Sequence, residues 1–411
     1  MKICLVTAFP PSKERLNEYG YHLAEQLRRK DYVSLTVLAD QLTEPAEELP
    51  GFDVVRCWKF NSIKTPLDLL RTARQVKPDV VWFNLVFSSF GDKPVAAFLG
   101  LCSALLLRLA GFYTHITLHH IIETLDLSKG TRFPRIYRFC GAVATKFLLW
   151  SNSISVLLPS YRKVLLDNYR GLNIHLRKHG VFAPPPKFPD ISKRGNPEHR
   201  ILGFGKWGTY KRLELLIEAF AQVAEKLPNT KLVIAGSNHP MTPGYVESVR
   251  DRWKDNPHIE FHGYIPEDKI ADLFIHSSVL VLPYSSAGGP SGVAHQACEY
   301  AVPIVASDLP DFRDMADSGQ IAMEFFESEN PDSLAEALEQ LLTDPVRQVE
   351  MAEQNFAVAL RMTMQEVVST YVYSFSRALA LSRRGQRRKQ VLAGTYQDMT
   401  AAPLKARAGS L

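Results

Sequence analysis

Cysteine is scarce in this sequence, and the few cysteines are scattered. The 411 residues contain five of them, at positions 4, 57, 102, 140 and 298, with no CxxC pair. An odd number at such wide spacing excludes a disulfide framework and gives no zinc-site pattern. The sequence also lacks an Asp-x-Asp motif of the kind that suggests a metal site. We therefore expect free thiols, a cytoplasmic location and no bound metal.

Long apolar runs are missing as well. Residues 1–11 form a short apolar run that ends in two prolines, without the long apolar region and cleavage site of a signal peptide. Residues 94–107 are uncharged and mostly apolar, but Arg108 interrupts their continuation. A helix that spans a membrane needs about 20 such residues. We expect a buried first strand at 2–7 and, at 93–110, a helix that is buried or lies at a membrane interface.

Glycine and proline stay near their ordinary usage, at 23 and 26 residues, and 46% of the chain is hydrophobic. These values exclude collagen-like, low-complexity and fully disordered chains. The length exceeds what one ordinary domain needs, so two domains with sizeable cores are expected.

The formal net charge of +5 hides an uneven distribution. Residues 128–180 carry ten Lys and Arg against Asp167, and residues 383–411 carry seven against Asp398. Large apolar residues are interleaved with the first group, namely Phe133, Tyr137, Phe139, Phe147, Leu148 and Trp150. Such a segment can form solvated helix faces, hold an anionic membrane surface or bind nucleic acid. Among the functional alternatives we favour the membrane, since no nucleic-acid-binding signature accompanies the charge.

Short β-branched runs alternate with amphipathic stretches in the first half of the chain. Helices are expected at 19–29 and 93–110, and strands at 2–7, 34–38, 54–57, 79–84 and 114–118. This alternation predicts βαβ units and a parallel sheet with helices on both faces. We assign residues 1–182 to a first Rossmann-like domain and the proline-rich residues 183–199 to a linker.

The same alternation starts again after the linker. It predicts a second doubly wound Rossmann-like domain at 200–364, followed by a helix at 365–382 that crosses back to the first domain. The basic residues 383–411 are expected to form a disordered tail. Two such domains face each other across a cleft, and in these sheets ligands bind beyond the carboxyl ends of the strands.

The first loop of the second domain carries two lysines. Residues 203–208 read Gly-Phe-Gly-Lys-Trp-Gly, a GxGxxG pattern, but a dinucleotide site also needs an acid after the next strand, where this chain has Gly236-Ser237-Asn238. Lys206 and Lys211 carry more weight, because Lys211 is expected at a helix N-terminus, which favours an anion. Two ammonium groups there would stabilise a departing phosphate. The alternative is a pair of ordinary exposed loop lysines.

Two further loops follow strands of the second domain. Residues 286–293 contain three glycines, which let backbone approach a ligand, and Ser291, which is a good N-cap for the next helix. This loop therefore suits a diphosphate. Residues 261–266 present backbone groups and Tyr264 to a nucleotide base, or they are a plain connection.

Together these loops resemble the donor domain of family-4-type retaining glycosyltransferases, which have the GT-B fold, over about residues 200–345. The matching pieces are Gly205-Lys206 with Lys211, where family members usually carry an Arg and a Lys, and the segments 232–236, 261–263 and 303–307. The first half is compatible with the family's acceptor domain, in which residues 117–119 resemble a strand-end motif whose histidine lies near the transferred sugar.

The resemblance implies a retaining, metal-independent hexosyltransferase that needs no cofactor and takes a nucleotide-diphosphate sugar as its donor. In the reaction it implies, the departing diphosphate oxygen accepts the acceptor's proton, so paired catalytic carboxylates are not required. The implied catalytic residues are His119, Lys206 and Lys211. The implied donor-binding residues are Gly205, Gly263, Tyr264, Gly288, Gly289, Ser291, Gly292, Val293 and Gln296.

The sequence departs from the family pattern in three places. The family's paired glutamates fall on Gly288 and Gln296, of which Gln296 could still bind ribose hydroxyls. The usual Asn-Gly after the first domain becomes His179-Gly180. The Gly-Gly loop of the acceptor domain is absent, which leaves as candidate phosphate or acceptor contacts Ser12, Lys13, Arg15 and Asn17.

We expect a cytoplasmic glycosyltransferase, peripheral to an anionic membrane surface, that acts on a glycan or lipid-linked acceptor in surface polysaccharide or glycolipid synthesis. Because both glutamates are missing, a catalytically weakened sugar-nucleotide-binding or partner protein is the first alternative. A nicotinamide-dependent oxidoreductase, which rests on the GxGxxG pattern alone, is the second.

Overall fold

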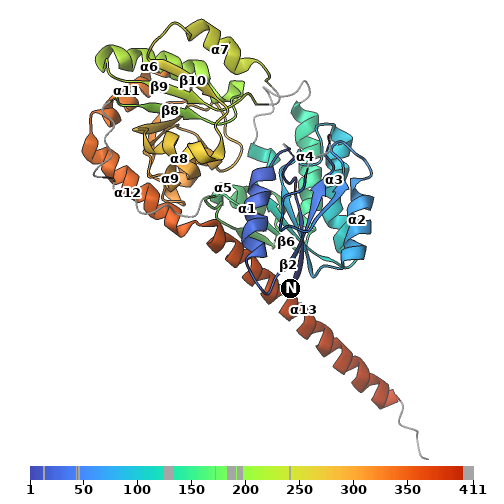
Figure 1. Cartoon of the computed structure of the whole chain (residues 1–411). Helices are drawn as coiled ribbons and strands as arrows, with labels where there is room; N and C mark the ends of the chain where they lie inside the picture. The colour runs from blue at the N-terminus through green and yellow to red at the C-terminus, as the bar shows by residue number, and fades with distance from the viewer. Residues whose placement is uncertain are drawn as a thin grey trace, which may run out of the picture.

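Two parallel β-sheets, each covered by helices, lie side by side in the computed structural model (Figure 1). The structure describes residues 1–400 apart from 13, 43, 45–46, 125–133, 172, 183–190, 192–197 and 240–241, with the backbone alone for 134 and 383–400. The predicted pair of doubly wound α/β domains is confirmed. Most of the predicted linker lies outside the described residues.

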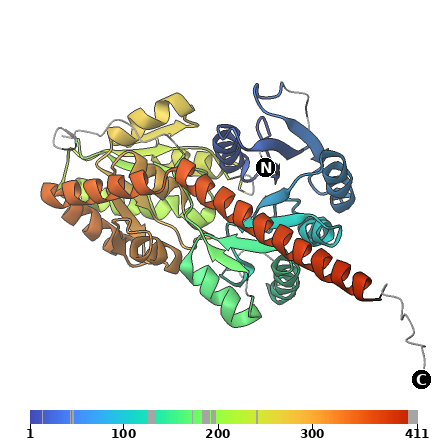
Figure 2. The ribbon, with the colours of Figure 1, turned by 90° about the horizontal axis from the view of Figure 1, so that it is seen from below.

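The first sheet has seven parallel strands in the order β3-β2-β1-β4-β5-β6-β7. Helices α2 (Thr65–Val76), α3 (Pro94–Leu109) and α4 (Pro134–Leu149) cover one face and α1 (Asn17–Arg28) covers the other (Figures 1 and 2). Because both faces are covered, the central strands are almost continuously apolar. The strands are β1 (Lys2–Val6), β2 (Ser34–Asp40), β3 (Val54–Trp58), β4 (Val80–Leu85), β5 (Tyr113–Leu118), β6 (Ser153–Val156) and β7 (Ile174–Leu176).

The second sheet has six parallel strands in the order β10-β9-β8-β11-β12-β13. Its strands are β8 (Ile201–Phe204), β9 (Leu232–Ala235), β10 (Ile259–Gly263), β11 (Val279–Leu282), β12 (Ile304–Ser307) and β13 (Glu324–Phe326). The helices between and after them are α6 (Leu213–Lys226), α7 (Tyr245–Trp253), α8 (Glu267–Ile275), α9 (Gly292–Glu299), α10 (Pro310–Asp317) and α11 (Pro331–Leu342).

The chain returns to the first domain at its end. Helix α12 (Pro345–Arg361) leads to α13 (Met364–Thr400), which runs along the first domain and packs on α1 (Figure 2). Tyr371 and Phe375 of α13 lie with their ring centroids 4.4 and 5.4 Å from Trp82 of β4. The helix expected at 365–382 thus crosses back and completes the core of the first domain.

Helix α13 does not end where we expected. It continues to Thr400, so the first part of the predicted disordered tail, residues 383–400, is helical. The physical reason is that Arg, Lys, Gln and Ala have high helix propensity, and a helix already formed on the first domain extends without a new nucleation step. Residues 401–411 lie outside the described residues.

Helix α3 is the segment whose apolar character raised the question of a membrane. Its buried residues include Gly100, Leu101, Ala104 and Leu107, and it packs between α2 and α4. This packing confirms a core helix. None of the helices in the described part of the chain combines the length and the apolar character that crossing a membrane requires.

Candidate functional site

Three loops of the second domain meet at the carboxyl ends of β8, β9 and β10. Gly236, with φ +111°, follows β9, and a Cβ atom there would lie 1.9 Å from the carbonyl oxygen of Gly205. No other residue type fits this crossing. Gly236 also donates its N–H to the carbonyl of Gly263, which ends β10. Two of the expected ligand-facing loops, those after β8 and β10, are therefore joined through the backbone of Gly236 at one edge of the sheet.

Lys211 lies at this edge as a buried cation. Its Nζ is 4.8 Å from the ring centroid of Tyr284 and 6.0 Å from that of Trp207, and no described residue forms an ion pair with it. Burial lowers the pKa of its ammonium group below the ordinary value. A Cβ at Gly205 would lie 2.9 Å from Nζ and 3.3 Å from Val293. A buried cation that has no ion-pair partner among the described residues is suited to bind an anion.

The local structure around Lys211 differs from the expected helix N-terminus. Lys211 ends a short 3₁₀ turn (Thr209–Lys211), and α6 begins two residues later. Arg212 separates the two elements because it adopts a left-handed conformation, with φ 50°. The macrodipole of α6 therefore adds less at Lys211 than the sequence suggested, since that effect falls off within the first turn.

The glycine loop before α9 is fixed from the second domain and touches the first. The Ser291 hydroxyl caps α9 by accepting a hydrogen bond from the Ala294 N–H (3.3 Å). The Gly289 N–H donates to the Asp311 carboxylate (2.9 Å), which also accepts from the Tyr161 hydroxyl of the first domain (2.7 Å). Asp311 thus ties the loop to the neighbouring domain, a role that the sequence did not indicate.

His119 follows β5 and meets this loop from the first domain. Its Nε2 donates to the Asn84 side-chain oxygen (2.7 Å), which leaves Nδ1 as an acceptor. Burial lowers the pKa of His119 to about 3, so the imidazole is neutral at physiological pH. A Cβ at Gly289 would lie 2.3 Å from the His119 carbonyl oxygen, so the two domains are in direct contact here.

Two more histidines lie where the domains meet. His179 follows β7 and His295 belongs to α9, and their ring centroids are 4.5 Å apart. The rings of Tyr19 and His119 are nearly perpendicular with their centroids 4.5 Å apart, and the Tyr19 hydroxyl donates a hydrogen bond to the His179 carbonyl. Sequence reasoning noted His179 only as a departure from the family and gave His295 no role.

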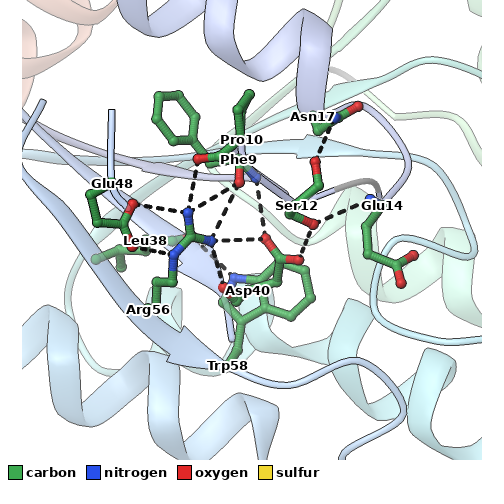
Figure 3. A network of polar contacts seen from close by, with 10 residues as sticks. All are labelled: Phe9, Pro10, Ser12, Glu14, Asn17, Leu38, Asp40, Glu48, Arg56 and Trp58. Atoms are coloured by element: carbon green, nitrogen blue, oxygen red, sulfur yellow. Dashed lines mark hydrogen bonds and ion pairs between the residues drawn. The ribbon is translucent and has the colours of Figure 1, made fainter. Parts of the chain in front are cut away.

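A polar network holds the loop after β1 on the first domain (Figure 3). The Arg56 guanidinium donates to the carbonyls of Pro10 and Asp40 (2.8 Å each) and pairs with Glu48, while the Asp40 carboxylate accepts from Ser12. Ser12 and its neighbour Asn17, which donates to the Ser12 carbonyl, are therefore structural. Among the four candidate contacts in this loop, Arg15 is exposed, where it donates to Ser88, and Lys13 lies outside the described residues.

The remaining predicted site residues are exposed or half-buried. Lys206 is exposed on the loop after β8. Burial raises the pKa of Glu18 of α1, and the charge of Lys206 opposes this shift without cancelling it. Tyr264, Gly288 and Gly292 are open to solvent to different degrees, and Gln296 is half-buried, with no hydrogen bond from its side chain to any described residue. Over the described ranges, no three His, Cys, Asp or Glu side chains are grouped as a metal site.

Replacing Gly289 with Ala tests the contact between the domains. The new Cβ would meet a backbone oxygen in the other domain, and φ is +106°, so we expect the free energy of unfolding to fall by about 1–3 kcal/mol. Gly292→Ala is the matched control in the same loop, because a Cβ there meets nothing within 4 Å, and we expect a change below about 0.5 kcal/mol. Chemical denaturation of both variants measures this. If Gly289→Ala and Gly292→Ala had the same free energy of unfolding, the contact between the two domains at Gly289 would be contradicted.

Comparisons with known proteins agree with this geometry. Residues 198–344 match the family model described as glycosyl transferases group 1. No curated protein sequence matches the chain.

Solved structures are similar over both domains. Sucrose-phosphate synthase from Thermosynechococcus elongatus has a TM-score of 0.69 at 15% identity, over 93% of this chain and all of that one. HepE from Anabaena, in complex with UDP-glucose, has a TM-score of 0.68 at 14% identity, over 92% of this chain and all of that one. A TarM variant from S. aureus, in complex with fondaparinux, alpha-GlcNAc-glycerol and UDP, has 0.56 at 15%, over 75% of this chain and 58% of that one. The chain therefore has the GT-B fold, and its second domain is similar to the group 1 glycosyl transferases.

Proposed function

We propose that this protein is a glycosyltransferase that moves a sugar from a nucleotide-diphosphate donor to a glycan or lipid-linked acceptor. The observation that carries the proposal is Lys211, a buried cation without an ion-pair partner among the described residues, held beside Gly205 and Val293. It lies in the domain that matches the group 1 family, beyond the carboxyl ends of its strands. Two structures of the same fold, HepE and the TarM variant, contain UDP-glucose or UDP, which supports a uridine nucleotide as the first donor to test.

In the proposed reaction, the chain stabilises a diphosphate leaving group. Lys211 and Lys206 supply positive charge, and the amides at the N-terminus of α9, from Gly292 and Val293, supply hydrogen bonds, since they donate to no other described residue. The Gly289 amide is engaged by Asp311 and instead positions the loop. His119 is neutral, and its Nδ1 accepts a hydrogen bond from a hydroxyl of the transferred sugar.

We propose retention at the anomeric carbon, with the departing diphosphate oxygen accepting the acceptor's proton. This step needs cations and amides at the diphosphate, which the chain's own residues supply, and it assigns no role to a metal. Gly205, Gly263 and Tyr264 complete the donor site around the base and ribose, with Gln296 offering its amide to the ribose. We further propose surface polysaccharide or glycolipid synthesis at the cytoplasmic face of a membrane as the setting.

Nucleotide binding gives the direct test. We expect one nucleoside diphosphate among UDP, GDP, ADP and CDP to stabilise the protein by about 2.7 kcal/mol at 100 times its dissociation constant, and NAD to have no effect. Thermal unfolding with each nucleotide measures this, and the Lys206→Ala/Lys211→Ala double variant should lose the stabilisation. Stabilisation by NAD alone would overturn the proposal.

A second candidate is a catalytically weakened sugar-nucleotide-binding or partner protein. It is favoured by Gly288 and Gln296, which stand where the family carries glutamates. Assays of sugar transfer and of donor hydrolysis distinguish the two candidates. A protein that binds the nucleotide but releases no nucleoside diphosphate from any donor tested is the weakened form.

A further inference from the structure

The N-terminal ends of α2, α3 and α4 carry large apolar side chains that point into solvent. Each is at least 40% exposed: Ile63 (62%), Leu67 (61%), Val95 (66%), Ile136 (60%), Tyr137 (40%) and Phe139 (70%). Large exposed apolar residues scattered singly are ordinary, whereas a group of them on one side of a domain marks an interaction surface. We call this group the helix-end surface.

The six residues belong to one end of the domain. Helices α2, α3 and α4 lie in a row on one face of the first sheet (Figures 1 and 2), and α3 packs against both of the others. Asn61, just before α2, accepts hydrogen bonds from the N–H groups of Asp92 and Lys93, just before α3 (3.0 Å each). The turns that lead into these two helices are therefore joined directly.

Helix α4 begins beyond the edge of the sheet. Residues 135–140 are all exposed, whereas Gly141, in the middle of the helix, packs against Ile122 after β5. The aromatic and basic segment noted in the sequence therefore does not form one continuous surface. Tyr137 and Phe139 are on the projecting end, Leu148 is buried in the core, and Trp150 is at the opposite end of the helix.

The charge around the helix-end surface is positive. Its exposed cations are Lys59, Lys64, Lys93, Arg135 and Arg138, and Asp92 is the exposed acid among them. None of the five cations forms an ion pair with another described residue. Exposed apolar side chains together with exposed cations fit the interface of a bilayer with anionic lipids, where apolar burial and electrostatic attraction add together.

We propose that the helix-end surface docks this protein on an anionic lipid bilayer. The proposal rests on the proposed function and deepens it, because α2, α3 and α4 begin at the carboxyl ends of the strands, the edge at which His119 lies. A lipid-linked acceptor can then present its sugar to the site while its lipid stays in the bilayer. The acceptor class selected by this geometry is a lipid-anchored glycan.

Vesicle co-sedimentation of the full chain tests the proposal. We expect binding to vesicles of phosphatidylcholine mixed with phosphatidylglycerol, weaker binding to phosphatidylcholine alone, and release by salt. Ile136→Ser/Phe139→Ser should lower vesicle affinity tenfold or more. Arg135→Ser and Arg138→Ser should each lower it by about fivefold. Leu109→Ser is the matched control, because Leu109 is 76% exposed at the opposite end of α3, and it should keep wild-type binding.

Three results would overturn the proposal. The first is that the wild-type chain does not bind anionic vesicles, and the second is that Leu109→Ser loses as much vesicle affinity as Ile136→Ser/Phe139→Ser. The third is that the protein self-associates and Phe139→Ser makes it monomeric, which would make this surface an interface between copies. The thermal midpoint of each variant, with and without the stabilising nucleotide, shows that the fold and donor site are intact. A chain that binds nucleotide but not vesicles contradicts the docking surface and leaves the proposed function standing.

Discussion

Replacing Lys211 with Met is expected to lower the catalytic efficiency with a nucleotide-sugar donor by at least about 100-fold, the cost of removing one preorganised donor to a developing charge. The same change is expected to raise the free energy of unfolding of the ligand-free protein. These effects have opposite signs because Lys211 is buried without an ion pair to any described residue, which costs stability until an anion binds. Methionine keeps the unbranched apolar stem and removes the charge.

The pH dependence of the Lys211 variant gives a further check. Burial lowers the lysine pKa from its ordinary value, so between the folded and unfolded pKa values the unfolded chain binds more protons. The wild-type free energy of unfolding therefore rises with pH across that alkaline window. Lys211→Met lacks this rise.

Two other lysines are matched controls for Lys211→Met. Lys206→Met should lose activity without a gain in stability, because Lys206 is already exposed. Lys226→Met should change neither, since Lys226 pairs with Glu339 on the outer surface of the second domain. Steady-state kinetics and chemical denaturation on the three variants measure both effects. A Lys211→Met protein that keeps its activity, or that unfolds more easily, would make this lysine a structural residue.

Most strands could be predicted because their apolar runs are short, rich in β-branched residues and bounded by polar segments. The run at 79–84 became β4 (Val80–Leu85), and the run at 114–118 became β5 (Tyr113–Leu118). Buried parallel strands give this signal regardless of their partners. The end of α13 gave no such signal, because a polar, basic composition is shared by exposed helices and disordered tails.

The loops of the site could be predicted for a different reason. The backbone after β9 crosses the backbone after β8 so closely that only glycine fits, and these glycines can be seen in the sequence. The burial of Lys211 did not appear, because Tyr284 lies more than seventy residues away in the chain. Asp311, His179 and His295 were missed for the same reason: their roles arise from contacts between segments more than a hundred residues apart.

Lowering the pH from 6.5 to 4 is expected to destabilise the contact between the domains. Burial lowers the pKa of His119 to about 3 and of His295 to about 4. Burial also lowers the pKa of His179 well below its ordinary value, and His295 and His119 lower it further. The folded state therefore binds fewer protons than the unfolded state below pH 6.5. The stability from these groups is complete above pH 6.5 and is lost as the pH falls toward 4, by about 3 kcal/mol each for His119 and His295.

The charged and titratable groups around the three histidines determine how much the free energy of unfolding falls at low pH. His179 faces His119 and His295, so protonation of one raises the cost of protonating the next. Asp311 acts in the opposite direction, because burial raises the pKa of its carboxyl, and protonation there favours the folded state. Replacing a single histidine separates these contributions, since Asp311 is unchanged in the variant.

His295→Gln is the variant that tests this dependence, because glutamine fills similar space and does not titrate. Between pH 6.5 and pH 4 its free energy of unfolding should fall by about 3 kcal/mol less than that of the wild type. His276→Gln is the control, because His276 is exposed just after α8, and it should follow the wild-type curve. Denaturation by urea at a series of pH values measures the slopes. Parallel curves for His295→Gln and the wild type would show that the histidines do not hold the domains together, and would leave the carboxylates as the source of any acid lability.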